Sequence, residues 1–217
     1  MSLCAGQGVP FQGRMRMGVI PTVAPYLLPG LLGQIRSQYP EFKLFIREDL
    51  SQPLVDALLS GELDVLCCLA FPAEQVETMP LFEDDFPAGL PPDHPLASRS
   101  PLRSADLKGE SLLLLEEGHC LRDHALEACK LRDSQITVPY QATSLATIVQ
   151  MVANGIGVTL LPGMAVEAGI TGNTPLAVKP FDQVNITRQI GLMWRKKTPR
   201  RVEFRQLGEL IAASVEE

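Results

Sequence analysis

The first third of the chain alternates short apolar runs with segments of helical periodicity. The expected strands are residues 14–20, 44–46 and 64–69, and the expected helices are residues 25–38 and 53–60. Ser51 precedes the second helix, and we interpret it as the helix N-cap. Residues 64–69 (DVLCCL) are almost continuously apolar, which is typical of a parallel strand covered on both faces. This order of strands and helices predicts a parallel α/β unit.

A stretch rich in proline and polar residues, 87–103, then leads into a second series of elements. The expected strands there are residues 112–115, 135–142, 158–161 and 189–194, and the expected helices are residues 121–131, 145–153 (capped by Ser144) and 202–215. Two halves of similar size, joined by a proline-rich crossover, predict an α/β fold of two Rossmann-like lobes with a hinge between them.

The pattern also predicts where the lobes begin and end. We expect lobe I to comprise residues 14–86 and 187–217, and lobe II to comprise residues 87–186. Residues 1–13 are interpreted as a tag or linker remnant, and we expect the natural protein to extend upstream of them.

Composition and charge narrow the classes of function. The 217 residues carry a net charge of −6, which argues against direct binding to the phosphate backbone of DNA. No apolar run reaches the roughly 18–20 residues that a membrane span needs. The five cysteines are an odd number, and no secretory signal precedes them, so we expect a cytoplasmic protein in which any disulfide is transient and redox-sensing.

Cys120 is the most informative residue because it falls at a predicted strand-to-helix junction. The positive end of the helix dipole and the nearby His119 and Arg122 favour its thiolate, the form of cysteine that attacks peroxide. The alternative interpretation is a small buried apolar residue, the commonest fate of a single cysteine. The local pattern leaves both open.

Cys129 follows nine residues later on the same predicted helix. At a rise of ~1.5 Å per residue, it lies roughly 14 Å from Cys120, on the opposite helix face. A disulfide tolerates Cα separations up to only ~7 Å. The two cysteines therefore cannot join while the helix persists, and a disulfide between them requires the helix to melt.

The segment GHCLRD (118–123), with Cys129 nine residues after its cysteine, resembles the peroxide-sensing members of the LysR-type transcriptional regulators. Three further stretches carry the resemblance, which spans residues 14–214: GVIPTVAPYLLP (18–29), ATSL (142–145) and GVTLLP (157–162). The resemblance implies the LysR-type effector-binding domain, a two-lobed fold like that of the periplasmic binding proteins. It also implies that the DNA-binding domain lies in another part of the full-length protein.

The resemblance implies a mechanism as well. Cys120 would be the peroxidatic cysteine, whose sulfenic acid condenses with Cys129 as the resolving thiol. Thr22 would orient bound peroxide, and Ser51 stands where the family usually has a second hydroxyl, that of threonine. The residues that would shape the peroxide pocket are His119, Arg122 and Asp123.

Thr143 and Ser144, at the predicted start of a helix, are candidates for binding an anion or another ligand, although capping alone explains Ser144 equally well. The chain departs from the family pattern at His124, which replaces a common glutamine, and at Gln141, which replaces a common arginine. Residues 86–90 (FPAGL) are an unusual crossover strand because proline lacks a backbone donor.

The partners that the resemblance implies are hydrogen peroxide, a second copy of the chain in a homodimer (a tetramer at full length), and a thiol reductant such as glutaredoxin or thioredoxin. DNA and RNA polymerase would be bound only through the full-length protein, which is expected to act as an activator.

No cofactor and no metal site is expected. The three histidines lack metal-site spacing relative to the cysteines. Gly155-Ile156-Gly157 precedes a strand, whereas the dinucleotide motif follows one. Cys67 and Cys68 are adjacent in an apolar strand, so they point to opposite faces and are both interpreted as core residues.

Two other functions remain open from the residues alone. The chain could be a LysR-type domain that binds a small anionic effector between its lobes, with the cysteines incidental. It could also be an enzyme, either a thiol peroxidase or a Cys/His hydrolase. A sensor reacts once and stays oxidised until it is reduced, whereas a peroxidase consumes peroxide continuously.

Overall fold

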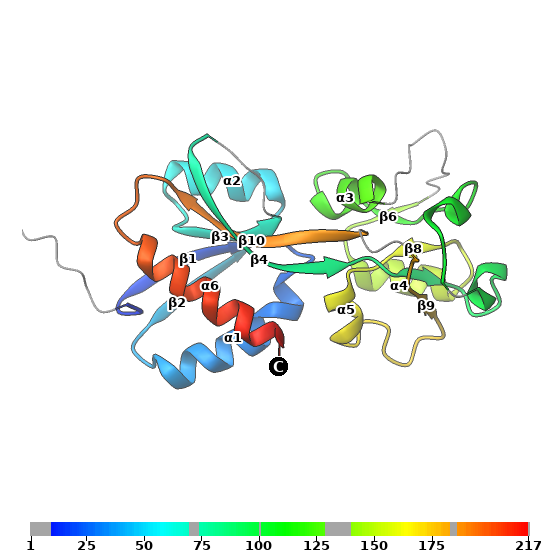
Figure 1. Cartoon of the computed structure of the whole chain (residues 1–217), viewed down its shortest axis with the longest axis horizontal. Coiled ribbons are helices and arrows are strands. Elements are labelled where there is room, and N and C mark those ends of the chain that lie inside the picture. The colour runs from blue at the N-terminus through cyan, green and yellow to red at the C-terminus, as the bar shows by residue number, and fades with distance from the viewer. Residues whose placement is uncertain (1–9, 70–73, 100, 129–139, 183–185, 217) are drawn as a thin grey trace, which may run out of the picture.

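The computed structural model has two lobes side by side, linked by long strands that run from one lobe into the other (Figure 1). It describes residues 10–69, 74–99, 101–128, 140–182 and 186–216. The two-lobed α/β architecture predicted from the sequence is confirmed. The lobe boundaries stay a prediction, although two separate clusters of buried apolar side chains support them.

The first lobe is built on a five-stranded sheet with the order β2-β1-β3-β10-β4. Its strands are β1 (Arg14–Val19), β2 (Lys43–Glu48), β3 (Val65–Leu69), β4 (Val76–Asp85) and β10 (Thr187–Arg195). β1 pairs in parallel with both β2 and β3, as the alternation of strands and helices predicts. β10 pairs antiparallel with β3 and β4, so the chain returns to this lobe near its C-terminal end.

Helices cover both faces of this sheet. They are α1 (Ala24–Gln38), α2 (Ser51–Ser60) and α6 (Arg201–Glu216). The chain steps from β1 to β2 in one direction and from β2 to β3 in the other, so right-handed crossovers place α1 and α2 on opposite faces. α6 contacts α1 and β4 on the α1 side (Figure 1). On the α2 side, Gly18 lets Leu54 approach closely, because an added Cβ would lie 2.9 Å from its Cδ2.

The sequence pattern missed β4. Its residues, VETMPLFEDD, include Pro80 and four acidic side chains, which argue against a strand. The structure accommodates them because β4 is the edge strand of the sheet, and an edge strand tolerates both proline and charge. The register with β10 shifts between Ile190 and Gly191, beside Pro80.

The second lobe contains two small sheets and a core of its own. β8-β5-β9 form one sheet, from β5 (Ala88–Leu90), β8 (Thr159–Leu160) and β9 (Ala177–Lys179); β6 (Leu114–Leu115) and β7 (Gln141–Ala142) form the other. Its helices are α3 (Cys120–Ala128), α4 (Leu145–Ala153), α5 (Gly163–Glu167) and the short 3-10 turns η1 (Pro95–Ser98) and η2 (Ser104–Leu107). β5 begins directly after Pro87, so the residue that lacks a backbone N–H donor lies outside the strand.

Several sequence predictions are adjusted by the structure. β9 and α5 were missed, because three- and five-residue elements carry too little periodicity to be recognised. The predicted ends of the helix at 121–131 and of the strand at 135–142 lie partly outside the described residues. Phe11, within the segment interpreted as a remnant, is buried and packs edge-on against Phe42. Among the described residues, no helix has the length and apolar character of a membrane span.

A buried ion pair fastens the strands where they pass between the lobes. The Arg188 side chain of β10 is fully buried, and its Nη2 lies 2.7 Å from Oδ2 of Asp84 on β4. The other Asp84 oxygen accepts a hydrogen bond of 2.8 Å from the backbone N–H of Met164, on α5 of the second lobe. One carboxylate thus connects both crossing strands to the second lobe.

Replacing Asp84 by asparagine removes the counter-charge and leaves the Arg188 guanidinium buried without it. We expect Asp84→Asn to lower the free energy of unfolding by about 3–5 kcal/mol, the usual cost of breaking a buried ion pair. Urea-induced unfolding followed by circular dichroism measures this change. The control is Glu62→Gln, which removes an exposed partner of Arg47 and should change the free energy of unfolding by less than about 1 kcal/mol. Equal losses in the two variants would contradict the role given to Asp84.

Candidate functional site

Cys120 lies in a narrow cavity between the two lobes. The cavity has about 150 Å³ of empty space. Its walls come from the end of β1, the start of α2 and the turn before α3: Ile20, Pro21, Thr22, Leu50, Ser51, Gly118, His119 and Cys120.

The turn before α3 places the cysteine in this cavity. Gly118 has a φ of +94°, in the left-handed region that favours glycine. An added Cβ there would also lie 3.2 Å from Leu50 Cδ1. The turn brings Cys120 to the first position of α3, where the backbone N–H groups of Cys120 and Leu121 lower the pKa of its thiol.

Burial nevertheless dominates the thiol's ionisation. Desolvation raises the pKa of Cys120 above its ordinary value of 9.0, against the opposing effects of the Ser51 hydroxyl, the Arg188 charge and the backbone donors. The expected effect of the helix start is therefore present, but burial outweighs it. The cation that does support the thiolate is Arg188, and not Arg122 or His119 as the sequence suggested.

Ser51 is part of the cavity but is not an N-cap. α2 begins at Ser51 itself, the cap position belongs to Leu50, and no side chain caps the helix. The Ser51 hydroxyl lies close enough to Cys120 to lower the pKa of the thiol. It is buried, and no described atom meets full hydrogen-bond geometry with it. The hydroxyl is thus available to a small polar molecule in the cavity.

Thr22 is held in place by Arg188. The Arg188 Nη1 donates to Thr22 Oγ1 at 2.9 Å, and its Nη2 donates to the Thr22 carbonyl at 3.0 Å. With both bonds made, the Thr22 side chain is almost fully buried and has a fixed orientation beside Cys120.

Sequence reasoning missed Arg188, although a signal for it was present. The predicted strand begins at Gln189, two residues after the observed start at Thr187, and so leaves Arg188 out. Extending the alternation of β10 back by two residues places Arg188 on the same face as the buried Ile190. An arginine at an inward position requires a buried partner, and Asp84 lay in the strand that the pattern also missed.

The residues that flank Cys120 differ in their environments. His119 is buried, and this burial lowers the pKa of its imidazole. His124, one helical turn after Cys120, is half-buried, and both burial and the Arg188 charge lower its pKa. Arg122 has a buried Nη1 without a partner among the described residues. Asp123 is exposed.

The remaining sequence candidates lie elsewhere. Ser144 caps α4, with its Oγ accepting from the Thr147 N–H at 3.3 Å, and so the capping interpretation is confirmed. Thr143 and Ser144 are exposed and do not line the Cys120 cavity, and Gln141 is exposed on β7. Cys129 lies outside the described residues.

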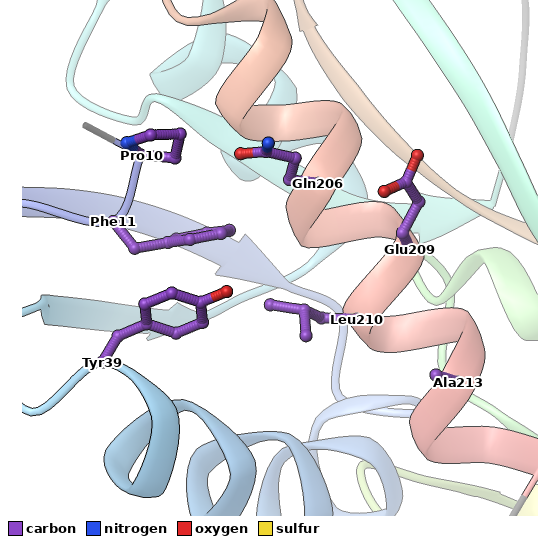
Figure 2. A pocket seen from close by; sticks show the side chains of 7 residues that line it. All are labelled: Pro10, Phe11, Tyr39, Gln206, Glu209, Leu210 and Ala213. Atoms are coloured by element: carbon purple, nitrogen blue, oxygen red, sulfur yellow. The ribbon is translucent and has the colours of Figure 1, made fainter. Parts of the chain in front are cut away.

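A larger cavity lies far from this chemistry. About 780 Å³ of space, open to solvent, is bounded by the N-terminal segment, the end of α1 and the outer face of α6 (Figure 2). Its lining residues are Pro10, Phe11, Tyr39, Gln206, Glu209, Leu210 and Ala213. It contains no thiol, so size alone does not identify the site. The described residues also include no cluster of three or more potential metal ligands.

Comparisons with known proteins give a consistent result. A probable hydrogen peroxide-inducible genes activator from Streptomyces viridosporus is 41% identical over 201 residues, which are 91% of this chain and 64% of the relative. The chain thus spans about two thirds of the length of such curated relatives.

Solved structures agree. The reduced regulatory domain of OxyR2 from Vibrio vulnificus has a TM-score of 0.88 and 39% identity, covering 97% of this chain and all of that one. A hydrogen-peroxide-bound mutant of OxyR from Corynebacterium glutamicum has a TM-score of 0.90 and 32% identity, covering 95% of this chain and 66% of that one. The family model of the LysR substrate binding domain matches residues 9–216. The chain therefore belongs to the LysR substrate-binding domain family.

Proposed function

We propose that this chain is the peroxide-sensing regulatory domain of a LysR-type transcriptional regulator, switched by a reversible disulfide between Cys120 and Cys129. One observation carries the proposal: Cys120 is the first residue of α3 and lines a narrow cavity together with Thr22 and Ser51. Peroxide-sensing regulators at about 40% identity support it.

The cavity residues divide the reaction between them. Cys120 is the nucleophile, and its sulfur takes one peroxide oxygen to become a sulfenic acid. The Ser51 hydroxyl and the Thr22 side chain orient the peroxide, because both face the space beside the sulfur. The charge of Arg188 favours the thiolate, and its guanidinium holds Thr22 by a hydrogen bond. His119 closes the cavity wall.

The length of α3 makes oxidation a conformational switch. The helix rises about 12 Å from Cys120 to Ala128. Cys129 is one peptide unit, about 3.8 Å, beyond Ala128. Its Cα is therefore at least about 8 Å from that of Cys120 while α3 persists, and a disulfide needs less than ~7 Å. Joining the two sulfurs requires α3 to unwind.

We expect the change in this domain to act on DNA through other domains of the full-length protein. Its relatives include DNA-binding regulators about half as long again, so we propose that unwinding of α3 changes how two copies of the domain pack and thereby repositions upstream DNA-binding domains. The same proposal includes a homodimer of this domain and a tetramer at full length. It also includes contact with RNA polymerase, a glutaredoxin- or thioredoxin-like reductant and a cytoplasmic location.

Cys129→Ser separates oxidation from refolding. Near-stoichiometric peroxide should remove two hydrogens from the unsubstituted protein and link the peptides of Cys120 and Cys129. The variant should form a sulfenic acid at Cys120, trapped by dimedone, without losing the circular dichroism of α3. Mass spectrometry and limited proteolysis provide the readouts.

Two results would contradict the proposal. Refolding that persists in Cys129→Ser would show that oxidation of one thiol suffices. An absence of Cys120 oxidation would favour a domain that binds a small effector. Continuous peroxide consumption in the presence of a thiol reductant, at rates typical of an enzyme, would indicate a thiol peroxidase instead.

The pKa of Cys120 predicts how the reaction depends on pH. Because burial raises the pKa of the thiol above its ordinary value, the thiolate is the minor form of Cys120 at pH 7. The rate of reaction with peroxide should therefore rise about tenfold per pH unit from pH 7 to 8. Stopped-flow measurement of sulfenic acid formation in the Cys129→Ser background tests this expectation. A flat profile would mean that the thiol ionises below pH 7.

Ser51→Ala tests the contribution of the hydroxyl. Losing a polar contact to a charged sulfur, worth about 1.5 kcal/mol, should slow the reaction about tenfold at pH 7. Ser51→Thr should retain most of the rate. The matched control is Ser60→Ala, at the other end of α2, whose hydroxyl bonds only to the Ala57 carbonyl. If both alanine variants react equally fast, Ser51 does not assist the reaction.

A further inference from the structure

Cys68 is a buried thiol that the proposed mechanism leaves unused. It lies on β3, is 2% exposed, and its Sγ is 3.3 Å from Met193 Sδ on β10. Its side chain points to the α2 face of the sheet, because Leu66, two residues earlier, reaches the Cβ position of Gly18 on that face. Cys67 points to the opposite face.

Cys68 lies next to a wall of the Cys120 cavity. β1 and β3 pair with Val19 opposite Cys67, and the Ile20 N–H donates to the Cys67 carbonyl. One residue further along both strands, Ile20 therefore lies opposite Cys68. Ile20 lines the cavity, and Cys120 packs against the core cluster that contains Cys68. One residue of the sheet thus touches the cavity while its neighbour carries a thiol.

The electrostatics of the two thiols agree with this placement. Burial raises the pKa of Cys68 most, and charges on Cys67 and on Cys120 raise it further. No such effect of Cys120 acts on Cys67, whose pKa burial raises to about 12. Of the two adjacent core cysteines, Cys68 is therefore the one whose pKa responds to a charge on Cys120.

We propose that Cys68 is a second, slower resolving thiol, which forms a disulfide with oxidised Cys120 when Cys129 does not. This inference rests on the proposed function, because it requires the sulfenic acid of Cys120. It concerns an alternative product of the same site.

The reaction balances without a further oxidant. Peroxide transfers one oxygen to the Cys120 sulfur as its O–O bond breaks, which gives a sulfenic acid and one water. The Cys68 sulfur then attacks the Cys120 sulfur, the S–O bond breaks, and the departing hydroxide takes the Cys68 proton to form a second water. The net change is the loss of two hydrogens from two thiols.

The two disulfides would have opposite structural consequences. A bond to Cys129 requires α3 to unwind, whereas a bond to Cys68, in the central part of the sheet, fastens the first turn of α3 to lobe I. The raised pKa of Cys68 leaves little thiolate, so its attack is slow. Cys68 would then protect Cys120 from irreversible oxidation and hold the domain in its unswitched form.

The test uses the full 217-residue chain with Cys129→Ser. After near-stoichiometric peroxide and alkylation of the remaining thiols, peptide mass spectrometry should find Cys68 linked to Cys120. Adding Cys68→Ala should abolish the link and, in a parallel sample given several equivalents of peroxide, increase the fraction of Cys120 carrying two or three oxygens severalfold. The matched control, Cys67→Ala, should leave both readouts unchanged.

Other outcomes overturn the inference in distinguishable ways. A dimedone adduct at Cys120 without a link to Cys68 would reject the second resolving thiol and leave the proposed function intact. No adduct and no link would reject both. A link from Cys120 to Cys67 or to Cys4 would reject Cys68 as the partner. Detecting the link in Cys129→Ser needs no substitution in the core, so it does not depend on how Cys68→Ala folds.

Discussion

The Arg188 guanidinium is the interaction on which the arrangement of the site depends. It has no exposed surface, and it bonds to Thr22 at the end of β1 and to Asp84 on β4. Burying a cation costs several kcal/mol unless it is well paired, so these partners must stay together for the lobes to hold their positions. Phe86 adds a ring contact with the guanidinium carbon 5.7 Å from its centroid.

The same charge reaches the reactive sulfur. It lowers the pKa of Cys120 against the stronger effect of desolvation, and it lowers the pKa of His124. The site therefore combines a buried, mostly protonated thiol with groups that stabilise its charged form. The sulfur lies in a narrow cavity between the lobes, with Thr22 and Ser51 among the residues that line it. Structural support and chemical tuning thus come from one network.

Helix geometry decides the second half of the mechanism. Cys120 opens α3 and the next cysteine in the chain follows the last described residue of that helix. Regular α-helix keeps these residues too far apart for a covalent bond. The sheet, in contrast, places Cys68 beside the cavity through the pairing of β1 with β3. The α3 helix thus keeps Cys129 away from Cys120, whereas the packing of β3 beside the cavity brings Cys68 near it.

The sequence by itself determined the helices and strands with clear periodicity, the two-lobed α/β class and the cysteine at a helix start. Those features depend on local repeats of apolar residues and on turn residues, which neighbours in the chain specify. It also placed Cys67 and Cys68 in the core, because adjacent strand residues in an apolar run face two covered sides.

Only the tertiary structure decided the rest. β4 forms because an edge position tolerates Pro80 and its acidic residues, and Arg188 is buried because Asp84, 104 residues away, lies opposite it. The pKa of the Cys120 thiol is raised because burial between the lobes outweighs the local backbone donors at the start of α3. Edge position, burial and ion pairing are relations between distant segments, and no local pattern of residues encodes them.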